Sequence, residues 1–396
     1  MIERLLDKAS WDLFLKSKLD NNYLSSYAKK QFTDYISQEK YREICQKIVD
    51  GTYQFTIPKK HIISKNSSSK RRVVYTFNDD EMMIMKCFAF FLYDYDYLFS
   101  PNLYSFRKNN GVRNALMSIS NNRKLKEMYG YKIDISNYFN SVDPFALITQ
   151  MQDYVSHDVI ELYKAVLLND KTVFRSQIIH ENKGAMTGTP LSSFAANIYI
   201  KKIDEFFFEE KVEYYRYADD IIFFTDSPNK RDYYVEKLLS LLKEKNLTVN
   251  KEKESYIEPH QYFEFLGFGF YEDRIDISKH AIKKFKGKVR RKIRKLYRWR
   301  IAKNFEPEKA LVAANRVFNK KFYGKSKNET SWSYWYFPFI NVSKSLKEID
   351  RYIQQEERYL FTGHHTKKNY KLCPYETLKK YGYRSLVNEF YIFKNH

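Results

Sequence analysis

Two sheet-forming runs with adjacent aspartates between them are the feature that most constrains this chain. Residues 214–226 read YYRYADDIIFFTD, in which aromatic and β-branched residues flank Asp219 and Asp220. Such runs predict a β-hairpin. Tight hairpin turns usually contain Asn-Gly or Asp-Gly because glycine tolerates positive φ, whereas an Asp-Asp pair adds like-charge repulsion. The stretch is therefore either a plain exposed hairpin tip or a place where a cation binds.

A third carboxylate ends another strand-like run. The segment YGYKIDISNYF at residues 129–139 predicts a buried strand that ends at Asp134 and turns into a helix. If this strand neighbours the hairpin in one sheet, the three carboxylates converge and repel one another unless divalent cations lie between them. Two Mg²⁺ ions about 3.5–4 Å apart could then activate an attacking hydroxyl and stabilise a pyrophosphate leaving group.

The basic charge of the chain is confined to its C-terminal part. Residues 279–396 contain 30 lysines and arginines against 9 aspartates and glutamates, whereas the first 278 residues contain 39 of each. This asymmetry predicts a polyanion-binding module attached to a neutral body, with a solvated basic tail as the alternative. From Lys279 to Lys303, 13 of 25 residues are basic and none is acidic. Apolar residues recur there every three or four positions, which predicts a helix with one packed face.

The amino-acid composition indicates the class of binding surface and the cellular compartment to expect. Aromatic residues make up 18% of the chain, and they supply flat faces for base stacking or for core packing. The three cysteines are too scattered for a ligand cluster and suit a reducing compartment. No apolar run reaches about 18 residues, so we expect a cytoplasmic protein without a membrane partner.

Ordered motifs resemble those of the reverse transcriptases. The string YADD inside an apolar hairpin resembles motif C of that family, and the resemblance extends over roughly residues 55–300. The other matching segments are KIDISNYFNSVD (132–143, motif A), GAMTGTPLSSFAANIYI (184–200, motif B), LTVNKEKE (247–254, motif D), FLGF (265–268, primer grip) and SFRKNNGVRNAL (105–116, a fingers motif of group II intron enzymes). Many relatives have Gln where this chain has Thr187, and the fingers motif has Asn where group II enzymes often have Gly.

The resemblance implies a two-metal active site. Asp134 and Asp219 would ligate two Mg²⁺ ions, for which Mn²⁺ could substitute. Asp220 would lie beside them, and the carbonyl of Ile135 would be a further ligand. Lys253 matches the motif D lysine that protonates departing pyrophosphate, with a solvated lysine as the alternative.

The resemblance also implies a nucleotide site. Phe139 matches the aromatic residue that excludes a 2′-hydroxyl, with core packing as the alternative role and Tyr138 as a competing candidate. Gly188 and Pro190 would shape the loop under the templating base. Arg107 would face the nucleotide or the template, with a surface charge as the alternative.

A basic hairpin is expected to contact the incoming triphosphate. Its basic residues are Lys65, Lys70, Arg71 and Arg72. We favour Arg72, because the planar guanidinium suits phosphate.

The implied fold is the α+β right-hand polymerase fold. Its expected parts are an N-terminal helical segment (1–52), fingers (53–128), a palm with an antiparallel sheet (129–275, with a fingers insertion near 150–185), a helical thumb (276–330) and a basic helical C-terminal extension (331–396). The thumb would bind nucleic acid phosphates without sequence choice through Lys284, Lys288, Arg291, Arg294, Lys295 and Arg298.

The implied function is RNA-directed DNA synthesis by a nucleotidyltransferase that uses dNTPs, an RNA template and a DNA product. No RNase H, integrase or HNH-like segment is evident, and the stretch NALMS (114–118) lacks the histidine usual in retron enzymes. The chain therefore most resembles unclassified bacterial reverse transcriptases associated with phage defence and related to abortive-infection enzymes, some of which copy a dedicated noncoding RNA. The alternatives are a retron-type enzyme that makes RNA-linked DNA, and an RNA-binding scaffold with a vestigial palm that acts through a partner. Self-association or a protein partner stays open.

Overall fold

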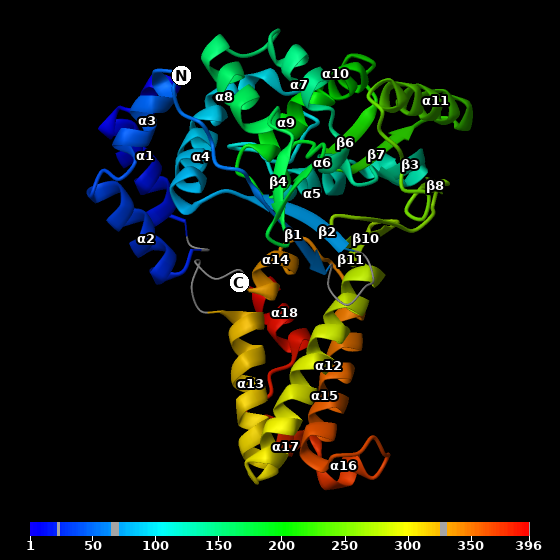
Figure 1. Ribbon diagram of the computed structural model, residues 1–396. Helices are drawn as coiled ribbons and strands as arrows, with labels where there is room; N and C mark the ends of the chain where they lie inside the picture. The colour runs from blue at the N-terminus through cyan, green and yellow to red at the C-terminus, as the bar shows by residue number, and fades with distance from the viewer. Residues whose placement is uncertain (22–23, 65–70, 325–330, 396) are drawn as a thin grey trace. The chain divides into compact units, whose positions relative to one another are not determined.

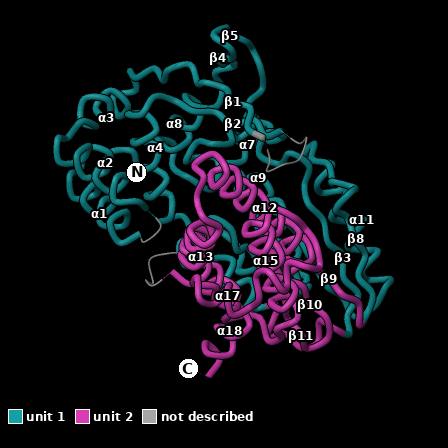
Figure 2. Tube along the Cα trace, turned by 90° about the horizontal axis from the view of Figure 1, so that it is seen from below, with its two compact units in different colours: residues 1–118, 127–259 teal, residues 119–126, 260–396 magenta. Residues whose placement is uncertain are grey.

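The computed structural model describes residues 1–21, 24–64, 71–324 and 331–395. The chain forms two compact units (Figure 2). Unit 1 contains residues 1–118 and 127–259, and unit 2 contains residues 119–126 and 260–396. Within the described ranges, no helix has both the length and the apolar character that crossing a bilayer requires.

Short amphipathic helices begin unit 1, as their sequence predicted. They are η1 (Ile2–Leu5), α1 (Lys8–Leu19), α2 (Ser26–Ser37) and α3 (Arg42–Val49). The carboxylate of Asp7 caps α1 by accepting hydrogen bonds from N–H groups of its first turn. Trp11 stacks on Tyr41 with ring centroids 4.1 Å apart, and its indole N–H donates to the carbonyl of Leu5 at 2.8 Å. The apolar faces of these helices therefore form a common core.

A four-stranded sheet in unit 1 has the order β2-β1-β4-β5. Its strands are β1 (Lys59–Ser64), β2 (Arg71–Thr76), β4 (Lys171–Phe174) and β5 (Gln177–His180). The run YQFTIP at residues 53–58 has the composition of a strand but forms none. The N–H of Thr56 donates instead to the buried carboxylate of Glu81 at 2.6 Å, and Pro58 has no N–H to offer a ladder. The polar groups of this segment are thus satisfied by a side chain.

The central sheet of unit 1 has the order β6-β7-β3-β8, and every neighbouring pair is antiparallel (Figure 1). Its strands are β3 (Tyr129–Asp134), β6 (Glu213–Tyr217), β7 (Asp220–Thr225) and β8 (Ser255–Ile257). Four successive residues of β7, from Ile221 to Phe224, are buried, so both faces of this strand are covered. The prediction that the Asp-Asp hairpin and the strand ending at Asp134 are sheet neighbours is confirmed.

Helices surround the two sheets of unit 1. They are α4 (Asp79–Phe91), η2 (Leu92–Leu98), α6 (Tyr138–Ser141), α7 (Pro144–Met151), α8 (His157–Leu167), α9 (Ser192–Tyr199), α10 (Lys201–Glu209) and α11 (Pro228–Glu244), with α5 (Val112–Asn121) and η3 (Arg123–Glu127) at the unit boundary. Helix α11 packs against β3 and β7.

The stretch 192–208 has the apolar spacing typical of a single helix capped by Ser192, but it forms two helices. Ser192 is already helical, and its hydroxyl donates to the carbonyl of Thr189 at 2.8 Å, so it cannot serve as the cap. The helix breaks at Ile200. The side-chain amide of Gln150 donates to the carbonyl of Ile198 at 2.6 Å and competes with the backbone ladder near the break.

Unit 2 combines a small antiparallel sheet with long helices. The strands are β9 (Phe263–Phe265), β10 (Phe268–Tyr271) and β11 (Arg274–Ile277), and the helices are α12 (Lys279–Ala302), α13 (Pro307–Tyr323), α14 (Trp332–Tyr336), α15 (Lys344–Thr362), α16 (Asn369–Leu372), α17 (Tyr375–Lys380) and α18 (Leu386–Lys394). The basic helix α12 packs against α13 and α15 (Figure 1). Ile282, Phe285, Val289 and Ile293 form its buried face, as their spacing predicted.

Candidate active site

The pairing of β3 with β7 brings predicted carboxylates to one end of the central sheet. Asp134 is directly opposite Asp220, and the register continues through six consecutive pairs to Tyr129 opposite Thr225. Directly opposite residues of an antiparallel pair share one face, with Cβ atoms about 4.5–5.5 Å apart. Two like charges so placed repel each other, and this geometry requires a nearby positive charge.

The turn between β6 and β7 holds Asp219 through its backbone. Ala218 has a φ of +57°, in the left-handed region that residues other than glycine rarely adopt. The N–H of Ile135 donates to the carbonyl of Asp219 at 2.9 Å. Asp219 is therefore fixed beside the end of β3, next to the opposed carboxylates.

Asp134 is held by the segment that follows α11. The backbone N–H of Asn250 donates to the carbonyl of Asp134 at 2.8 Å, and the side-chain amide of Asn250 lies 3.5 Å from Oδ1 of the same residue. The ammonium group of Lys253 forms an ion pair with Oδ2. Asp134 is buried, while the Lys253 side chain is about half exposed. No role was predicted for Asn250, although it lies in the same LTVN motif that pointed to Lys253.

Asp220 is a buried carboxyl group with charged neighbours of both signs. Burial raises the pKa of Asp220 to about 6. The two neighbouring carboxylates act in the same direction, and the ammonium groups of Lys132 and Lys253 act against it. Ionised Asp220 therefore costs free energy, and a bound cation would lower this cost.

The donors at this end of the sheet fit a divalent cation. Carboxylate oxygens are hard ligands of the kind that Mg²⁺ prefers, and the Lys253 ammonium already lies as a cation against Asp134. Within the described ranges, no three or more His, Cys, Asp or Glu side chains converge closely enough to enclose a metal ion. Mg²⁺ does not require such a cage, because it keeps several waters and also accepts substrate phosphates.

Comparison with known protein families identifies the chain. The family described as "Reverse transcriptase (RNA-dependent DNA polymerase)" matches residues 57–270, more than half of the 396 residues. The chain belongs to the reverse transcriptase family. It is therefore an RNA-directed DNA polymerase with the mixed α/β polymerase fold of that family and a helical C-terminal region.

Among solved structures, the reverse transcriptase is similar to telomerase from Candida albicans, determined with the TWJ fragment of telomeric RNA. The sequences are 14% identical, the match covers 88% of this chain and 68% of the telomerase chain, and the TM-score is 0.43. No curated protein matches the sequence.

The loop before α9 of the reverse transcriptase lies against strand β2. The carbonyl of Thr187 accepts a hydrogen bond from the N–H of Tyr75 at 2.7 Å. Gly188 has a φ of +106°, and a Cβ there would lie 2.8 Å from the carbonyl oxygen of Tyr75, so only glycine fits. The hydroxyl of Thr187 donates to the side chain of Asn140 at 3.0 Å. Pro190 ends this loop and is partly exposed.

The predicted triphosphate-contacting arginine lies on the surface of β2. Arg72 is exposed and pairs across the strands with Ile63. Arg71 precedes it and is also exposed. Lys65 and Lys70 lie outside the described residues. The assignment of Arg72 to the nucleotide stays a prediction.

Arg107 has structural partners. Its guanidinium donates to both carboxylate oxygens of Asp96 at 3.0 Å and to the carbonyl of Ser100 at 2.7 Å, and only 11% of its side chain is exposed. These contacts hold the loop that follows η2. To reach a nucleotide, Arg107 would have to leave all of them.

The two candidate gate residues differ clearly in their surroundings. Tyr138 is buried, and its hydroxyl donates to the carbonyl of Ala196. Phe139 is partly exposed and makes an edge-on contact with Phe106 at 6.0 Å between ring centroids. Phe139 is therefore the aromatic side chain that a sugar could reach.

Basic side chains form a stripe along α12. Lys284, Lys288, Arg291, Lys295 and Arg298 recur at intervals of three or four residues, which places them on one side of the helix. Burial lowers the pKa of the Lys288 ammonium, and the like charges of Lys321, Lys284 and Arg291 lower it further.

Arg294 differs from the other predicted nucleic-acid contacts of α12. Its guanidinium lies 3.8 Å from the ring centroid of Tyr359, and one of its nitrogens lies 3.2 Å from His365. Arg294 therefore faces α15. Its predicted contact with nucleic acid stays untested.

Replacing Lys253 by methionine should tighten the binding of divalent cations. The ammonium group then no longer competes for Asp134, and two unit charges about 4 Å apart interact by about 1 kcal/mol even in water, which corresponds to about fivefold in affinity. Mn²⁺ binding followed by electron paramagnetic resonance measures the change. Lys251→Met is the control, because Lys251 pairs with Glu254 at 2.7 Å instead. Unchanged or weaker binding in Lys253→Met alone would contradict the prediction.

Proposed function

We propose that Asp134, Asp219 and Asp220 are the catalytic carboxylates of this reverse transcriptase. The observation that carries the proposal is the β3–β7 register, in which Asp134 lies opposite Asp220. The carbonyl of Ile135 is proposed as a further oxygen ligand, since its own N–H is bonded to Asp219. When bound, a pair of Mg²⁺ ions activates the attacking 3′-hydroxyl and stabilises the pyrophosphate leaving group.

Other groups of the chain orient the carboxylates and move a proton. Asn250 holds Asp134 through its backbone N–H. Lys253 is proposed as the general acid that protonates departing pyrophosphate, because its ammonium group lies at the carboxylates yet half of its side chain is exposed.

Nucleotide selection is assigned to the residues around the loop before α9. Phe139 is proposed to exclude the 2′-hydroxyl, and Gly188 and Pro190 to shape the floor under the templating base. Arg72 is proposed to bind the triphosphate. The partners of Arg107 favour a structural role for it, in which it holds Asp96 and the carbonyl of Ser100.

Further, we assign the parts of a right-hand polymerase to the chain. Their proposed bounds are 1–52 for the N-terminal segment, 53–128 for the fingers, 129–275 for the palm, 276–330 for the thumb and 331–396 for the C-terminal extension. The basic stripe of α12 would contact the phosphates of the template–product duplex, which gives salt-sensitive affinity without sequence preference.

In its biological setting, the enzyme is proposed to copy a noncoding RNA that it binds itself, as part of bacterial antiviral defence. The motif pattern supports this, since NALMS departs from the retron pattern. A retron-type enzyme remains the second candidate. The carboxylate set argues against a vestigial scaffold, because such a scaffold would not need Asp134 and Asp220 opposite each other with Asp219 in the adjoining turn.

Asp219→Asn should abolish dNTP incorporation. Loss of a residue that only orients a metal ligand typically lowers activity by up to about 100-fold. Removing the charge of a metal ligand itself is expected to lower the rate of incorporation by more than that. Primer extension on an RNA template with Mg²⁺ measures it. Asp226→Asn is the matched control, because Asp226 follows the far end of the same strand and pairs with Lys230 on the surface. Incorporation by Asp219→Asn at the wild-type rate would refute the assignment, and an inactive wild-type protein would favour the scaffold.

Phe139→Ala should admit ribonucleotides, because the ring no longer excludes the 2′-hydroxyl. The ratio of kcat/KM for a dNTP to that for the matching rNTP is expected to fall by at least about tenfold. Phe145→Ala serves as the control, since the Phe145 side chain is 69% exposed on α7. An unchanged ratio would point to another gate.

Sequencing of the nucleic acid that copurifies with the protein tests the proposed template. One enriched RNA together with DNA complementary to it is the expected result. An unselected mixture of cellular RNA would contradict a dedicated template, and DNA covalently joined to RNA would favour the retron-type enzyme.

A further inference from the structure

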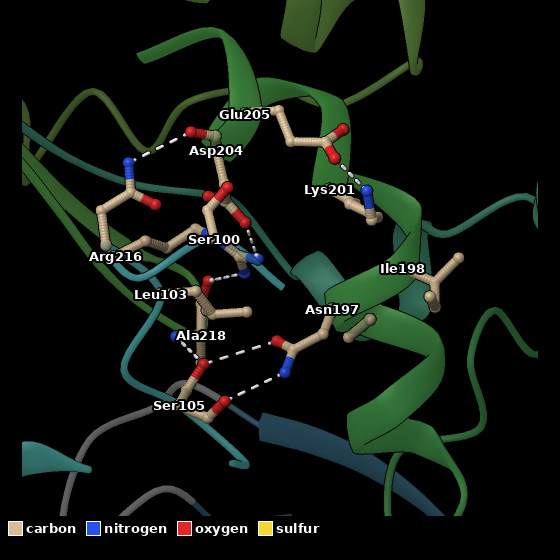
Figure 3. A network of polar contacts seen from close by, with 12 residues as sticks. Ser100, Leu103, Ser105, Asn197, Ile198, Lys201, Asp204, Glu205, Arg216 and Ala218 are labelled. Carbon is tan, nitrogen blue, oxygen red and sulfur yellow. Dashed lines mark hydrogen bonds and ion pairs between the residues drawn. The ribbon is translucent and has the colours of Figure 1, made fainter. Parts of the chain in front are cut away.

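A buried ion pair lies directly behind the β6–β7 turn. Nε of Arg216, near the end of β6, donates to Oδ1 of Asp204 on α10 at 2.6 Å, and Nη2 donates to the other carboxylate oxygen (Figure 3). The hydroxyl of Tyr214 donates to the same carboxylate at 3.0 Å. Burial by itself would lower the pKa of Arg216, but the charge and hydrogen bonds of Asp204 raise it, so the guanidinium stays charged.

The ion pair reaches the turn through the third nitrogen of the guanidinium. Nη1 of Arg216 donates to the carbonyl of Ala218 at 3.2 Å. On the other side, the N–H of Ala218 donates to the hydroxyl of Ser105 at 2.8 Å (Figure 3). Both backbone polar groups of Ala218, the residue just before Asp219, are therefore bonded to side chains.

Ser105 is itself held in place from two directions. The side-chain amide of Asn197 donates to the carbonyl of Ser105 at 2.9 Å, and the Ser105 hydroxyl lies 3.5 Å from the amide oxygen of Asn197. The preceding residues run alongside β6, because the N–H of Tyr104 donates to the carbonyl of Arg216 at 2.9 Å. The hydroxyl that receives the Ala218 N–H thus has a fixed position.

These four side chains form a unit that we name the turn clamp. It consists of Ser105, Asn197, Asp204 and Arg216, each at most 1% exposed.

Stability alone does not explain the turn clamp. Desolvation of two charges offsets much of the attraction in a buried ion pair, and replacing such a pair by apolar side chains is often neutral or stabilising. The left-handed φ of Ala218 adds backbone strain at the same place. Strain that the surroundings maintain is typical of functional sites, and partners behind a ligand typically orient it.

We propose that the turn clamp is a positioning device for catalysis. It fixes the backbone of Ala218 and thereby aims the carboxylate of Asp219 toward Asp134. The inference rests on the proposed catalytic role of Asp219, and it assigns to the reaction four residues that do not touch the substrate. Loss of the clamp should lower metal affinity and kcat together, while the KM for dNTP stays nearly constant because the nucleotide contacts lie elsewhere.

Ser105→Ala is the smallest test, since it removes one oxygen and leaves the N–H of Ala218 without its acceptor. We expect a decrease of about 10- to 100-fold in kcat and in Mn²⁺ affinity, with the KM for dNTP within about twofold of wild type. Ser10→Ala is the control, because Ser10 is also buried and its hydroxyl donates to Asp7 at 2.7 Å, in α1. The control should leave both quantities unchanged.

The double variant Asp204→Leu with Arg216→Met provides a second test, which does not depend on whether Ser105→Ala folds. It replaces the ion pair by apolar side chains, so circular dichroism and the Tm should stay near wild type. Its kcat and Mn²⁺ affinity should nevertheless fall as in Ser105→Ala.

Comparing the turn clamp variants with Asp219→Asn, by kcat and by Mn²⁺ affinity, distinguishes failure of this inference from failure of the proposed function. Folded clamp variants with wild-type kcat and Mn²⁺ affinity, beside an inactive Asp219→Asn, would overturn the positioning role and leave the catalytic assignment intact. If Asp219→Asn itself kept wild-type incorporation and Mn²⁺ binding, the catalytic assignment would fall and the inference with it. Loss of kcat and Mn²⁺ affinity at constant KM supports the turn clamp.

Discussion

Electrostatic repulsion between carboxylates at the end of one β-ladder is the constraint on which the rest of unit 1 depends. The β3–β7 register forces Asp134 and Asp220 onto the same face, and the turn adds Asp219 beside them. In an isolated hairpin this arrangement would be unfavourable. The surrounding protein maintains it by burying both faces of β7, so that a slip of one residue would move every buried side chain of the strand into the packing of the opposite face.

The cationic side chains of the chain differ in burial and in the partners that they contact. Lys253 touches Asp134 directly and is partly exposed, so it can move when substrate arrives. Arg216 lies behind the turn, is completely buried and is neutralised by Asp204, so it can orient the backbone without competing for a cation. The basic stripe of α12 belongs to unit 2, and nucleic acid phosphates are its proposed partners.

A feature could be predicted from the sequence where the residues that produce it are close together in the chain. Asp134, the Asp-Asp hairpin and the packed face of α12 were predictable, because strand and helix periodicities are local. No strand forms at residues 53–58 because Thr56 bonds to Glu81, and Arg107 is held by Asp96. No local sequence pattern predicts either contact. The turn clamp was missed for the same reason. A signal was present, since Arg216 is a charged residue between two tyrosines of a strand, and a charge buried there requires a partner.

The period of two along a strand has a consequence for how such a protein can change over evolutionary time. Inserting or deleting one residue between Tyr129 and Asp134, or between Asp220 and Thr225, would turn a carboxylate to the opposite face of the sheet. Both stretches must therefore keep their length, even where their apolar residues are exchanged. Insertions and deletions among descendants of this chain should accumulate in connections such as that between α8 and β4, because a change of length there does not alter the register of the β3–β7 pair.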